Sequence, residues 1–483
     1  MRVGTISVLG LTRTRREVVV RELLFQPGDL VDSSAVAESG RNLRRLLYLS
    51  NTEIRLLPRP GQAPSEQASA TPDTLLVDAE IRVAELYARA LSPLISGDLE
   101  ELSYGVVALD YNLFGRGGTG RLVLHHDAIT GNEASLLIGA SRLRESQLDL
   151  QVLTGLAAEG HDLALGLSRP FRRLSDPWAC GVVASSSEAD QRLYSSGRLV
   201  ARYTDRYNGA RVWVTRSLGD RVKVRPGLIL SLSDRRSEAA RGFSYTPQDR
   251  RRILPSASLL VWRPRYVRAR FIHALGPTED LQTGSWASLR VGLSHRGLGS
   301  DRTYPFASLL LSPRRHVALG SVTYLYADLS LSSRYRHGGY ENLVASGQVL
   351  AYAQVRERHT AALRLRLETL SRPETESQFL LGVNTGLRGF LPRQWDGTRR
   401  LVANAEVRPV FWQRPLFVLG AAAFVDAGAA WTPDESAFEL QAGFGGGIRL
   451  GLPTVYATPV LRLDLARGMG GIGQLAFGVG QYF

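Results

Sequence analysis

The sequence predicts a small N-terminal α+β domain, residues 1–85, followed by an all-β antiparallel barrel that crosses a membrane, residues 86–483. Three observations support this fold class. The apolar residues follow a helical period only before residue 86, and simple alternation replaces it afterwards. No stretch of roughly 18 apolar residues is free of charge, so helices do not cross the membrane. Glycine is abundant, with 48 residues, and charged residues recur inside apolar segments, as a barrel with a wet interior requires.

Within the first 85 residues the pattern gives the element order β-α-α-β-β. Pro27-Gly28-Asp29 ends the first helix, and Asp32 or Ser33 caps the second. A Pro/Ala/Ser/Gln-rich stretch from Pro58 to Asp73 reads as a flexible insertion in a hairpin. The expected elements are a strand around Ile6 and Val8, a helix over 14–24, a second helix ending near Ser50, and strands over 52–57 and 75–83.

From residue 86 onward, apolar residues alternate with polar ones. Leu363, Leu365 and Leu367 interleave with Arg364, Arg366 and Glu368, and in a strand the two sets face opposite sides. Such strands suit lipid on one face and water on the other, and only a closed barrel satisfies every backbone hydrogen bond in lipid. The same alternation recurs at 163–168, 289–294 and 461–465.

The length of this region gives the expected number of strands. A membrane strand of about 10 residues plus its turn or loop takes roughly 25 residues, which predicts about sixteen strands. The rival interpretation is a soluble propeller or solenoid, but the sequence has no fixed internal period.

The formal net charge of +14 does not predict a nucleic-acid-binding protein. The charge is dispersed, Lys223 is the only lysine, and no basic run is interleaved with stacking aromatic residues. Cys180 is the only cysteine, so we expect no internal disulfide and no thiol-based metal site. The chain shows no signal peptide, and we expect that an export signal, and with it other domains, was removed or lies upstream.

No catalytic constellation is apparent, and we expect neither enzymatic activity nor a cofactor. His125 and His126 are adjacent, so a strand directs them to opposite sides and they cannot jointly bind one metal ion. His161-Asp162 lacks a partner at ligand spacing, and the chain contains no G-x-S-x-G or H-E-x-x-H motif.

The N-terminal region resembles a POTRA domain over its whole length. The resemblance implies a periplasmic domain that adds unfolded client segments as extra strands to an exposed sheet edge. A generic small α+β domain is the alternative. The motifs that carry the resemblance are Val8-Leu9-Gly10, Thr14, Pro27-Gly28-Asp29 and Leu43-Arg44-Arg45-Leu46.

Several barrel motifs resemble, in order, those of BamA/TamA-type outer-membrane proteins. They begin with Asn112-Leu113-Phe114-Gly115-Arg116-Gly117 near the barrel start. Leu387-Arg388-Gly389-Phe390 resembles the family's motif at the tip of a long loop that folds back into the lumen. The remaining motifs are Asn404, Glu406 and Arg408 in one strand, Phe424-Val425-Asp426-Ala427-Gly428 in the next, and Gly445-Gly446-Gly447-Ile448-Arg449-Leu450 after it.

The resemblance implies that Arg388 at the loop tip contacts Asp426 on the inner wall and pins the loop. A planar guanidinium pairs best with a carboxylate through two charge-assisted hydrogen bonds, and a barrel interior screens the pair less than the surface does. Gly389 lets the backbone approach closely, and Phe390 packs beside it. In the alternative, Arg388 is one more arginine of the lumen.

The C-terminal residues resemble the closing strand of outer-membrane proteins. Leu475, Phe477, Val479 and Phe483 alternate with residues that include Gly478 and Gly480, although Gln481 stands where a hydrophobic residue is usual. The resemblance implies that this strand closes against the first one, near Ala88 to Gly97. Gly478 and Gly480 fit a short, weak seam, because they have no side chains to pack across it.

The function that the resemblance implies is assembly of unfolded outer-membrane clients into the outer membrane, or their passage across it. The partners would be unfolded outer-membrane or secreted proteins and outer-membrane lipid, with the N-terminal domain in the periplasm. One alternative is a secretion pore dedicated to a single partner, including the case in which this chain is the export half of a fused passenger. Another is a passive outer-membrane porin.

Overall fold

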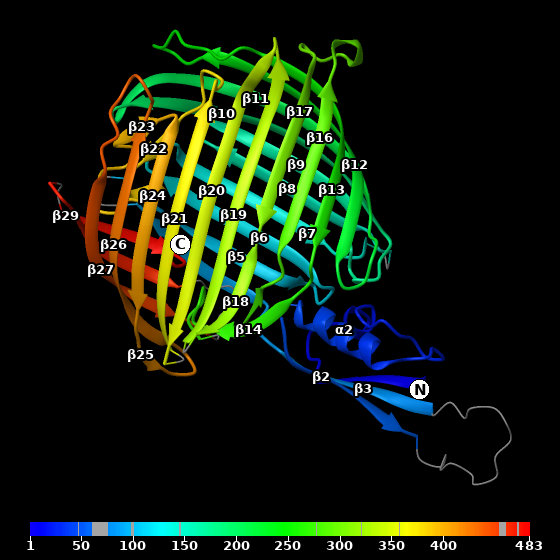
Figure 1. Cartoon of the computed structure of the whole chain (residues 1–483). Coiled ribbons are helices and arrows are strands. Elements are labelled where there is room, and N and C mark those ends of the chain that lie inside the picture. The colour runs from blue at the N-terminus through cyan, green and yellow to red at the C-terminus, as the bar shows by residue number, and fades with distance from the viewer. Residues whose placement is uncertain are drawn as a thin grey trace.

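A computed structural model describes residues 1–46, 48–59, 76–97, 101–143, 146–276, 278–319, 321–356, 358–453, 460–470 and 473–483. It contains a small α+β unit attached to one end of a large barrel (Figure 1). We call this end of the barrel proximal and the opposite end distal. Most of the insertion expected over 58–73 lies outside the described residues.

The N-terminal unit has the order β1 (Arg2–Leu9), α1 (Arg16–Val20), α2 (Ser33–Arg44), β2 (Leu49–Pro58) and β3 (Leu76–Glu85). Its sheet has the strand order β1-β3-β2, with β1 parallel and β2 antiparallel to β3. The Asp32 side chain accepts a hydrogen bond from Ala35 N (2.7 Å) and caps α2, as expected. Val18, Val19 and Leu43 from the two helices are buried against the sheet.

Both helices are shorter than expected. The first covers 16–20 instead of 14–24, and the second ends at Arg44 instead of near Ser50. After α1 the chain continues in tight turns, because Leu23 and Phe25 both reach the buried core of the unit. A continuous helix would direct those two side chains, two residues apart, to different sides.

The N-terminal unit is joined to the barrel by the first proximal turns. Asn112 Nδ2 donates to Thr14 Oγ1 (2.8 Å), and Asn112 Oδ1 accepts from Gly117 N (2.8 Å). Arg15 N donates to Gly115 O (2.9 Å). The motif from Asn112 to Gly117 therefore shapes the turn on which the N-terminal unit rests.

The barrel closes in the order β10 to β13, β16 to β21, β24 to β29 and β4 to β9. Two of its 22 segments continue a neighbour across a proline: β17 and β18 flank Pro313, and β24 and β25 flank Pro409. The described chain therefore forms 20 antiparallel strands. The segments are β4 (Arg89–Ser96), β5 (Ser103–Leu113), β6 (Gly118–Asp127), β7 (Gly131–Ala140), β8 (Asp149–Ala157), β9 (Gly160–Arg169), β10 (Trp178–Ser195), β11 (Arg198–Arg216), β12 (Lys223–Ala239), β13 (Arg250–Trp262), β16 (Trp286–Ser294), β17 (Tyr304–Ser312), β18 (Arg314–Leu319), β19 (Ser321–Arg336), β20 (Gly339–Val355), β21 (His359–Ser371), β24 (Arg399–Arg408), β25 (Val410–Gln413), β26 (Val418–Trp431), β27 (Gln441–Gly451), β28 (Leu461–Gly468) and β29 (Gly473–Val479).

The expected number of about sixteen strands is wrong. The estimate allotted a loop to every strand, whereas several connections are two-residue turns. Ser196-Gly197 and His337-Gly338 join long strands, and all four residues have positive φ, as tight hairpin turns require. Shorter connections leave residues for four more strands.

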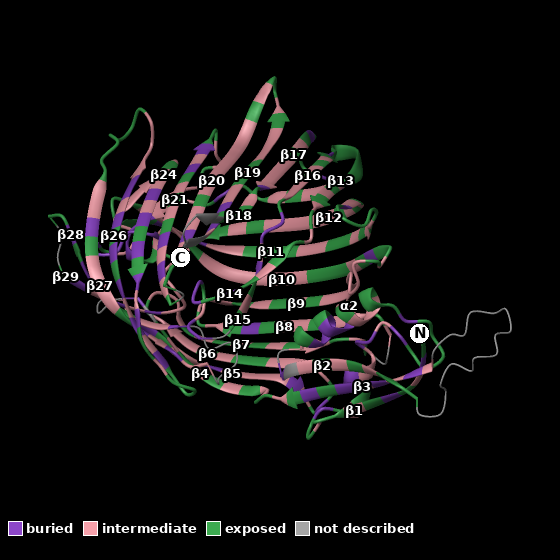
Figure 2. Ribbon diagram, turned by 60° about the horizontal axis from the view of Figure 1, so that its bottom comes forward, coloured by how far each residue is buried: buried purple, intermediate pink, exposed green. Residues whose placement is uncertain are grey.

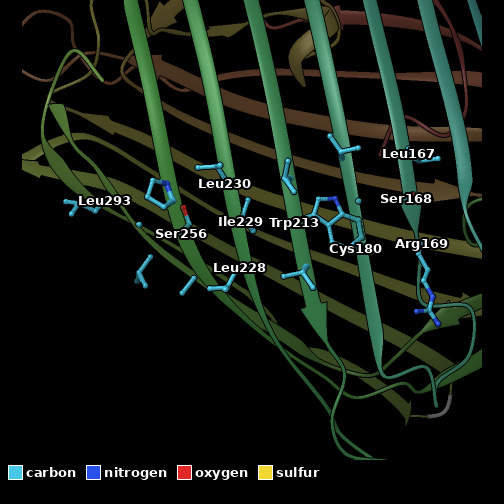
Figure 3. A pocket seen from close by; sticks show the side chains of 18 of the residues that line it. Leu167, Ser168, Arg169, Cys180, Trp213, Leu228, Ile229, Leu230, Ser256 and Leu293 are labelled. Carbon is cyan, nitrogen blue, oxygen red and sulfur yellow. The ribbon is translucent and has the colours of Figure 1, made fainter. Parts of the chain in front are cut away.

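The outer face of the barrel is apolar. Leu363, Leu365 and Leu367 are 50%, 48% and 51% exposed there, while Arg364 points into the lumen and donates to Asn404. Over β9 to β13 and β16 the wall carries a shallow, almost wholly apolar hollow, where Leu228 and Leu230 alternate with Ile229 along β12 (Figure 3). A closed barrel with this face is built to lie in lipid. None of the described helices is long and apolar enough to span a membrane.

The seam between β4 and β29 is the weakest junction that the described residues show. The two strands meet in an isolated antiparallel bridge between Gly97 and Phe477, in which Phe477 N donates to Gly97 O (3.1 Å). By contrast, β28 and β29 pair over seven residues, and β4 and β5 over eight. The seam lies where the sequence predicted it, beside Gly97.

Two connections fold into the lumen. At the distal end, residues 372–398 include β22 (Phe379–Leu381), the 3-10 turn η3 (Val383–Thr385) and β23 (Trp395–Gly397). At the proximal end, β14 (Tyr266–Arg270) and β15 (Thr278–Gln282) form a hairpin between β13 and β16. Figure 2, with the bottom turned forward, shows β14 and β15 inside the ring of barrel strands. A short 3-10 turn, η2 (Arg296–Leu298), stays at the distal rim.

Candidate functional site

The distal loop carries Arg388 into the lumen, where its side chain is fully buried. Arg388 Nε donates to Asp426 Oδ2 (2.7 Å), and Nη2 donates to Asp426 Oδ1 (2.9 Å). This is the two-pronged pairing of guanidinium and carboxylate that the residue types favour. The predicted pair of loop arginine and wall aspartate is thus in direct contact.

Two further carboxylates share the same guanidinium. Arg388 Nη1 donates to Glu406 Oε1 (2.6 Å) on β24 and to Asp464 Oδ2 (3.3 Å) on β28. Both side chains are fully buried. All three carboxylates therefore come from the inner wall, on strands β24, β26 and β28, and they converge on one residue of the loop.

Arginines of the wall balance these carboxylates. Arg408 Nε donates to Glu406 Oε2 (2.7 Å), Arg449 Nη1 donates to Asp464 Oδ1 (2.5 Å), and Arg462 Nη1 donates to Asp464 Oδ2 (3.2 Å). Buried charges are costly unless each has a partner. We call Arg388, Glu406, Arg408, Asp426, Arg449, Arg462 and Asp464 the Arg388 cluster.

Two aromatic rings enclose the Arg388 guanidinium. Its Cζ lies 3.4 Å from the ring centroid of Phe424 and 3.9 Å from that of Tyr482. Tyr482 Oη donates to Val383 O (2.7 Å), so the ring also contacts the loop backbone. A desolvated cation over an aromatic face contributes about 2 kcal/mol. Phe424 was expected from the strand motif, whereas Tyr482 was not.

Gly389 and Phe390 pack on β28. Gly389 has φ +87, and a Cβ there would lie 2.5 Å from Gly468 N and 2.6 Å from the Arg467 carbonyl carbon. Gly468 N also donates to Gly389 O (3.1 Å). The Phe390 ring covers Gly468 and meets Trp395 edge-on at 5.1 Å. A side chain at 389 would push the loop off the wall.

The other predicted motif residues surround this contact. Asn404 Nδ2 donates to Asp426 Oδ1 (2.6 Å) and to Gly386 O (2.8 Å), so it ties the wall to the loop backbone. Leu387 is fully buried in an apolar cluster with residues that include Leu381 and Val402. A Cβ on Gly428 would meet the Leu401 carbonyl oxygen at 2.9 Å and the Leu381 side chain at 3.4 Å.

The expected closing strand needs a correction. Phe477 and Gly478 lie on β29, but the strand ends at Val479, and Gly480 adopts φ +92. Phe483 therefore lies beyond the strand: Arg408 Nη2 donates to Phe483 O (3.0 Å), and its ring is 5.0 Å from Arg364 Cζ. The left-handed turn and the guanidinium groups draw this segment into the lumen.

From the sequence, no role in this site was predicted for Asp464, Arg462, Tyr482 and Gln474, and Arg449 was named only as part of a strand motif. Gln474 Oε1 accepts from Gly389 N (3.1 Å). The alternation Leu461, Leu463, Leu465 already directed Asp464 to the lumen, so a search for inward acids would have found it. No local pattern could reveal Tyr482, because it acts after the strand has ended.

The carboxylates of this arrangement are paired with guanidinium groups. The described residues contain no group of three or more His, Cys, Asp and Glu side chains that could hold a metal ion. Each carboxylate of the cluster already accepts hydrogen bonds from a guanidinium. The geometry therefore anchors a loop to the inner wall.

Comparison with known proteins gives fold-level likeness only. No family model and no curated protein matches the sequence. Among solved structures, BamA from Haemophilus ducreyi lacking POTRA domains 1–3 is 14% identical, with a TM-score of 0.46 over 100% of this chain and 84% of that one. CdiB from Acinetobacter baumannii is 13% identical, with a TM-score of 0.48 over 99% of this chain and 73% of that one. CdiB from Escherichia coli is 12% identical, with a TM-score of 0.49 over 99% of this chain and 76% of that one. The structural neighbours of this chain thus include BamA and CdiB, at low sequence identity.

Proposed function

We propose that this protein is an outer-membrane barrel that inserts unfolded client proteins into the outer membrane or passes them across it. The N-terminal unit lies in the periplasm and acts as a POTRA domain that captures clients. No cofactor and no catalytic step are part of the proposal. Client folding and burial in lipid supply the driving force.

The observation that carries the proposal is the seam between β4 and β29. A strand edge in lipid must satisfy its N–H and C=O groups within the protein. Among the described residues β4 and β29 share one bridge, so closing this seam leaves backbone groups unpaired and opening it breaks few hydrogen bonds. Each backbone hydrogen bond contributes about 1 kcal/mol net in water, so the described seam adds little to closure. An incoming strand can therefore pair with either edge by strand addition.

The N-terminal sheet offers an edge of the same kind. Within the described residues, β2 pairs with β3 and with no other strand. Its outer edge therefore leaves backbone groups that an extended client segment can use. The two edges, one on the N-terminal unit and one at the seam, suit successive capture and release of the same strand.

The filled lumen argues against a passive porin. The distal loop crosses the interior: Arg388 is bound to the wall at β24, β26 and β28, and Gln378 Nε2 donates to Tyr194 O (2.7 Å) on β10. A porin keeps an open, water-filled channel. A loop attached on both sides of the interior obstructs one.

A disulfide across the seam tests the proposal. If the register of Gly97 and Phe477 is continued by two residues, Ile95 stands opposite Val479, and Ile95→Cys with Val479→Cys is designed to lock the seam. Cys180→Ser removes the native thiol. We expect oxidation to stop insertion of an unfolded barrel client into proteoliposomes and reduction to restore it. The matched control is Val106→Cys with Leu124→Cys, a pair within the β5–β6 ladder. Equal insertion by locked and unlocked protein would contradict the proposal.

Depleting this protein in its native cell distinguishes general barrel assembly from secretion of a single partner. Broad loss of outer-membrane barrels from the proteome would indicate general assembly. Loss of one exported protein, with barrels intact, would indicate a dedicated secretion pore for that partner. An unchanged proteome would overturn both.

A further inference from the structure

The hairpin formed by β14 and β15 is not needed to connect its neighbours. It leaves the wall after Trp262 and returns at Trp286, and these two residues are already paired across β13 and β16. Arg263 N also donates to Ser285 O (3.1 Å), so a two-residue turn could join the strands. Between residues 263 and 285 the chain instead leaves the wall and enters the lumen.

The tip of the hairpin reaches the wall at β25 and β26. Its tip residues Phe271 and Leu275 pack with Val410, Val418 and Val460, from β25, β26 and the segment before β28. In the closed order of 20 strands, β26 lies seven positions from β13.

The lumen side of the hairpin rests on aromatic residues. Ile272 is fully buried, and it packs with Tyr324, Tyr326 and Tyr352 of β19 and β20. Thr360 Oγ1 donates to Phe271 O (2.6 Å), and Arg408 Nη1 donates to Ile272 O (3.4 Å). Arg408 belongs to the Arg388 cluster, so the hairpin contacts the same cluster that anchors the distal loop.

Hydrogen bonds hold the backbone at the tip of the hairpin. Glu279 on β15 accepts hydrogen bonds from Ile272 N (3.1 Å), His273 N (3.1 Å) and Ala274 N (3.2 Å). Arg270 Nη2 donates to Gly276 O (2.7 Å). A carboxylate that accepts three successive N–H groups holds the backbone in one shape. The tip is a preformed element, and the wall accommodates it.

We propose that this hairpin, residues 263–276 and 278–285, is a lid over the proximal mouth of the barrel. Entry of a bulky molecule from the proximal side would then require release of Phe271, Ile272 and Leu275 from the wall. The inference goes beyond the proposed function, because closure of the mouth is measured without a client.

Access of a bulky thiol reagent to the lumen tests the lid. Arg235 meets Glu376 of the distal loop, so Ser231, four residues earlier on β12, faces the same lumen. We place Ser231→Cys in a Cys180→Ser background and measure the rate of reaction with a polyethylene-glycol maleimide. Ser196→Cys, at an exposed distal turn, reports unhindered labelling.

Replacing 264–284 by Asn-Gly removes the lid and keeps the β13–β16 pairing. We expect labelling at 231 to rise about tenfold or more, because protection of a buried site reports how often it opens. Labelling at 196 should not change. Equal rates at 231 with and without the hairpin would overturn the lid, as would labelling of the intact protein at 231 as fast as at 196.

A point variant keeps the test decisive if the deletion does not fold. Ile272→Asp places an unpaired charge in the docked face, which favours release of the hairpin and leaves the wall strands unaltered. Its matched control is Leu298→Asp, at a half-exposed distal position. We expect faster labelling at 231 for Ile272→Asp alone. No acceleration in a variant that still shows heat-modifiable migration of the folded barrel would contradict the proposal.

Discussion

The Tyr482 ring covers one face of the Arg388 guanidinium, 3.9 Å from its Cζ, while Phe424 covers the other face. Tyr482 follows β29, the strand at the seam, and Arg388 belongs to the distal loop. The position of the loop and the path of the chain after the closing strand are therefore coupled. Loosening either one should loosen the other.

Replacing Tyr482 should release the distal loop. Tyr482→Ala removes a half-buried ring and uncovers the guanidinium, which should cost about 2 kcal/mol. Tyr482→Phe keeps the ring and loses only the hydrogen bond to Val383 O, which costs about 1 kcal/mol. The temperature at which the folded barrel loses its fast gel migration measures both. Equal loss in the two variants would show that the ring contact is unimportant.

Removing Arg388 should free the loop and strain the wall. Arg388→Ala leaves Asp426 and Glu406 buried with one charge partner fewer, and such a break costs about 3 to 5 kcal/mol. Arg388→Lys should not restore stability, because an ammonium cannot form the two-pronged contact. Proteolytic cleavage within 372–398 reports release.

The matched control for Arg388 is Arg366→Ala. Arg366 also faces the lumen, but it is partly exposed and pairs with Glu368 alone, so its loss should cost about 1 kcal/mol or less. Similar cleavage of the Arg388 and Arg366 variants would refute the special role of the Arg388 cluster.

Gly389→Ala should displace the loop from β28. The added Cβ would meet backbone atoms at 2.5 Å and 2.6 Å, in addition to the strain of a positive φ. Gly470→Ala has a similar φ of +80 and no neighbour within 4 Å, so it isolates the conformational strain, about 1 kcal/mol. We expect a clearly larger fall in barrel melting temperature for Gly389→Ala. Equal falls would mean that close packing on Gly468 contributes nothing.

Asn112→Ala should loosen the N-terminal unit on the barrel. Asn112 is buried, and its side chain bridges Thr14 and Gly117, so its removal costs about 1 to 3 kcal/mol of docking energy. The width of a spin-label distance distribution between unit and barrel should increase. Asn132→Ala, at a distal turn, is the control and should leave it unchanged. Unchanged width in Asn112→Ala would place the docking energy elsewhere.

The N-terminal unit should lose stability in acid through Glu85. Burial raises the pKa of Glu85, but hydrogen bonds from Thr12, Thr14 and Arg13 N outweigh it and lower the pKa to about 2. Since the folded pKa lies below the unfolded value near 4.5, the stabilisation is present above pH 4.5 and is lost as the pH falls toward 2. Glu85→Gln should therefore speed cleavage of residues 1–85 by pepsin near pH 4.5.

The difference between wild type and Glu85→Gln should shrink as the pH falls from 4.5 to 2, because the folded-state carboxyl is half protonated at its pKa of about 2. Measuring the two cleavage rates from pH 4.5 to 2 tests the sign of the effect. A difference that grows as the pH falls would contradict this account of Glu85.

Much of the site could be predicted because its residues carry local signals. The motif resemblance named Asn404, Glu406 and Asp426 in successive strands, and it implied that Arg388 and Gly389 lie at the tip of a loop in the lumen. The convergence of three carboxylates on Arg388 could not be predicted. Asp464 lies 76 residues away from Arg388, and no periodicity within a strand reports which distant strand lies alongside.

The α+β unit, the all-β character of the rest and the side chains that face lipid could all be predicted, since each follows from the spacing of neighbouring residues. The number of strands, the inward turn at Gly480 and the docking of the proximal hairpin became known from the folded structure. Ring size depends on how many strands pair before the sheet closes, and the hairpin is stable only where the opposite wall offers Val410, Val418 and Val460. Those contacts join residues that are far apart in the chain, so they arise only once the barrel has closed.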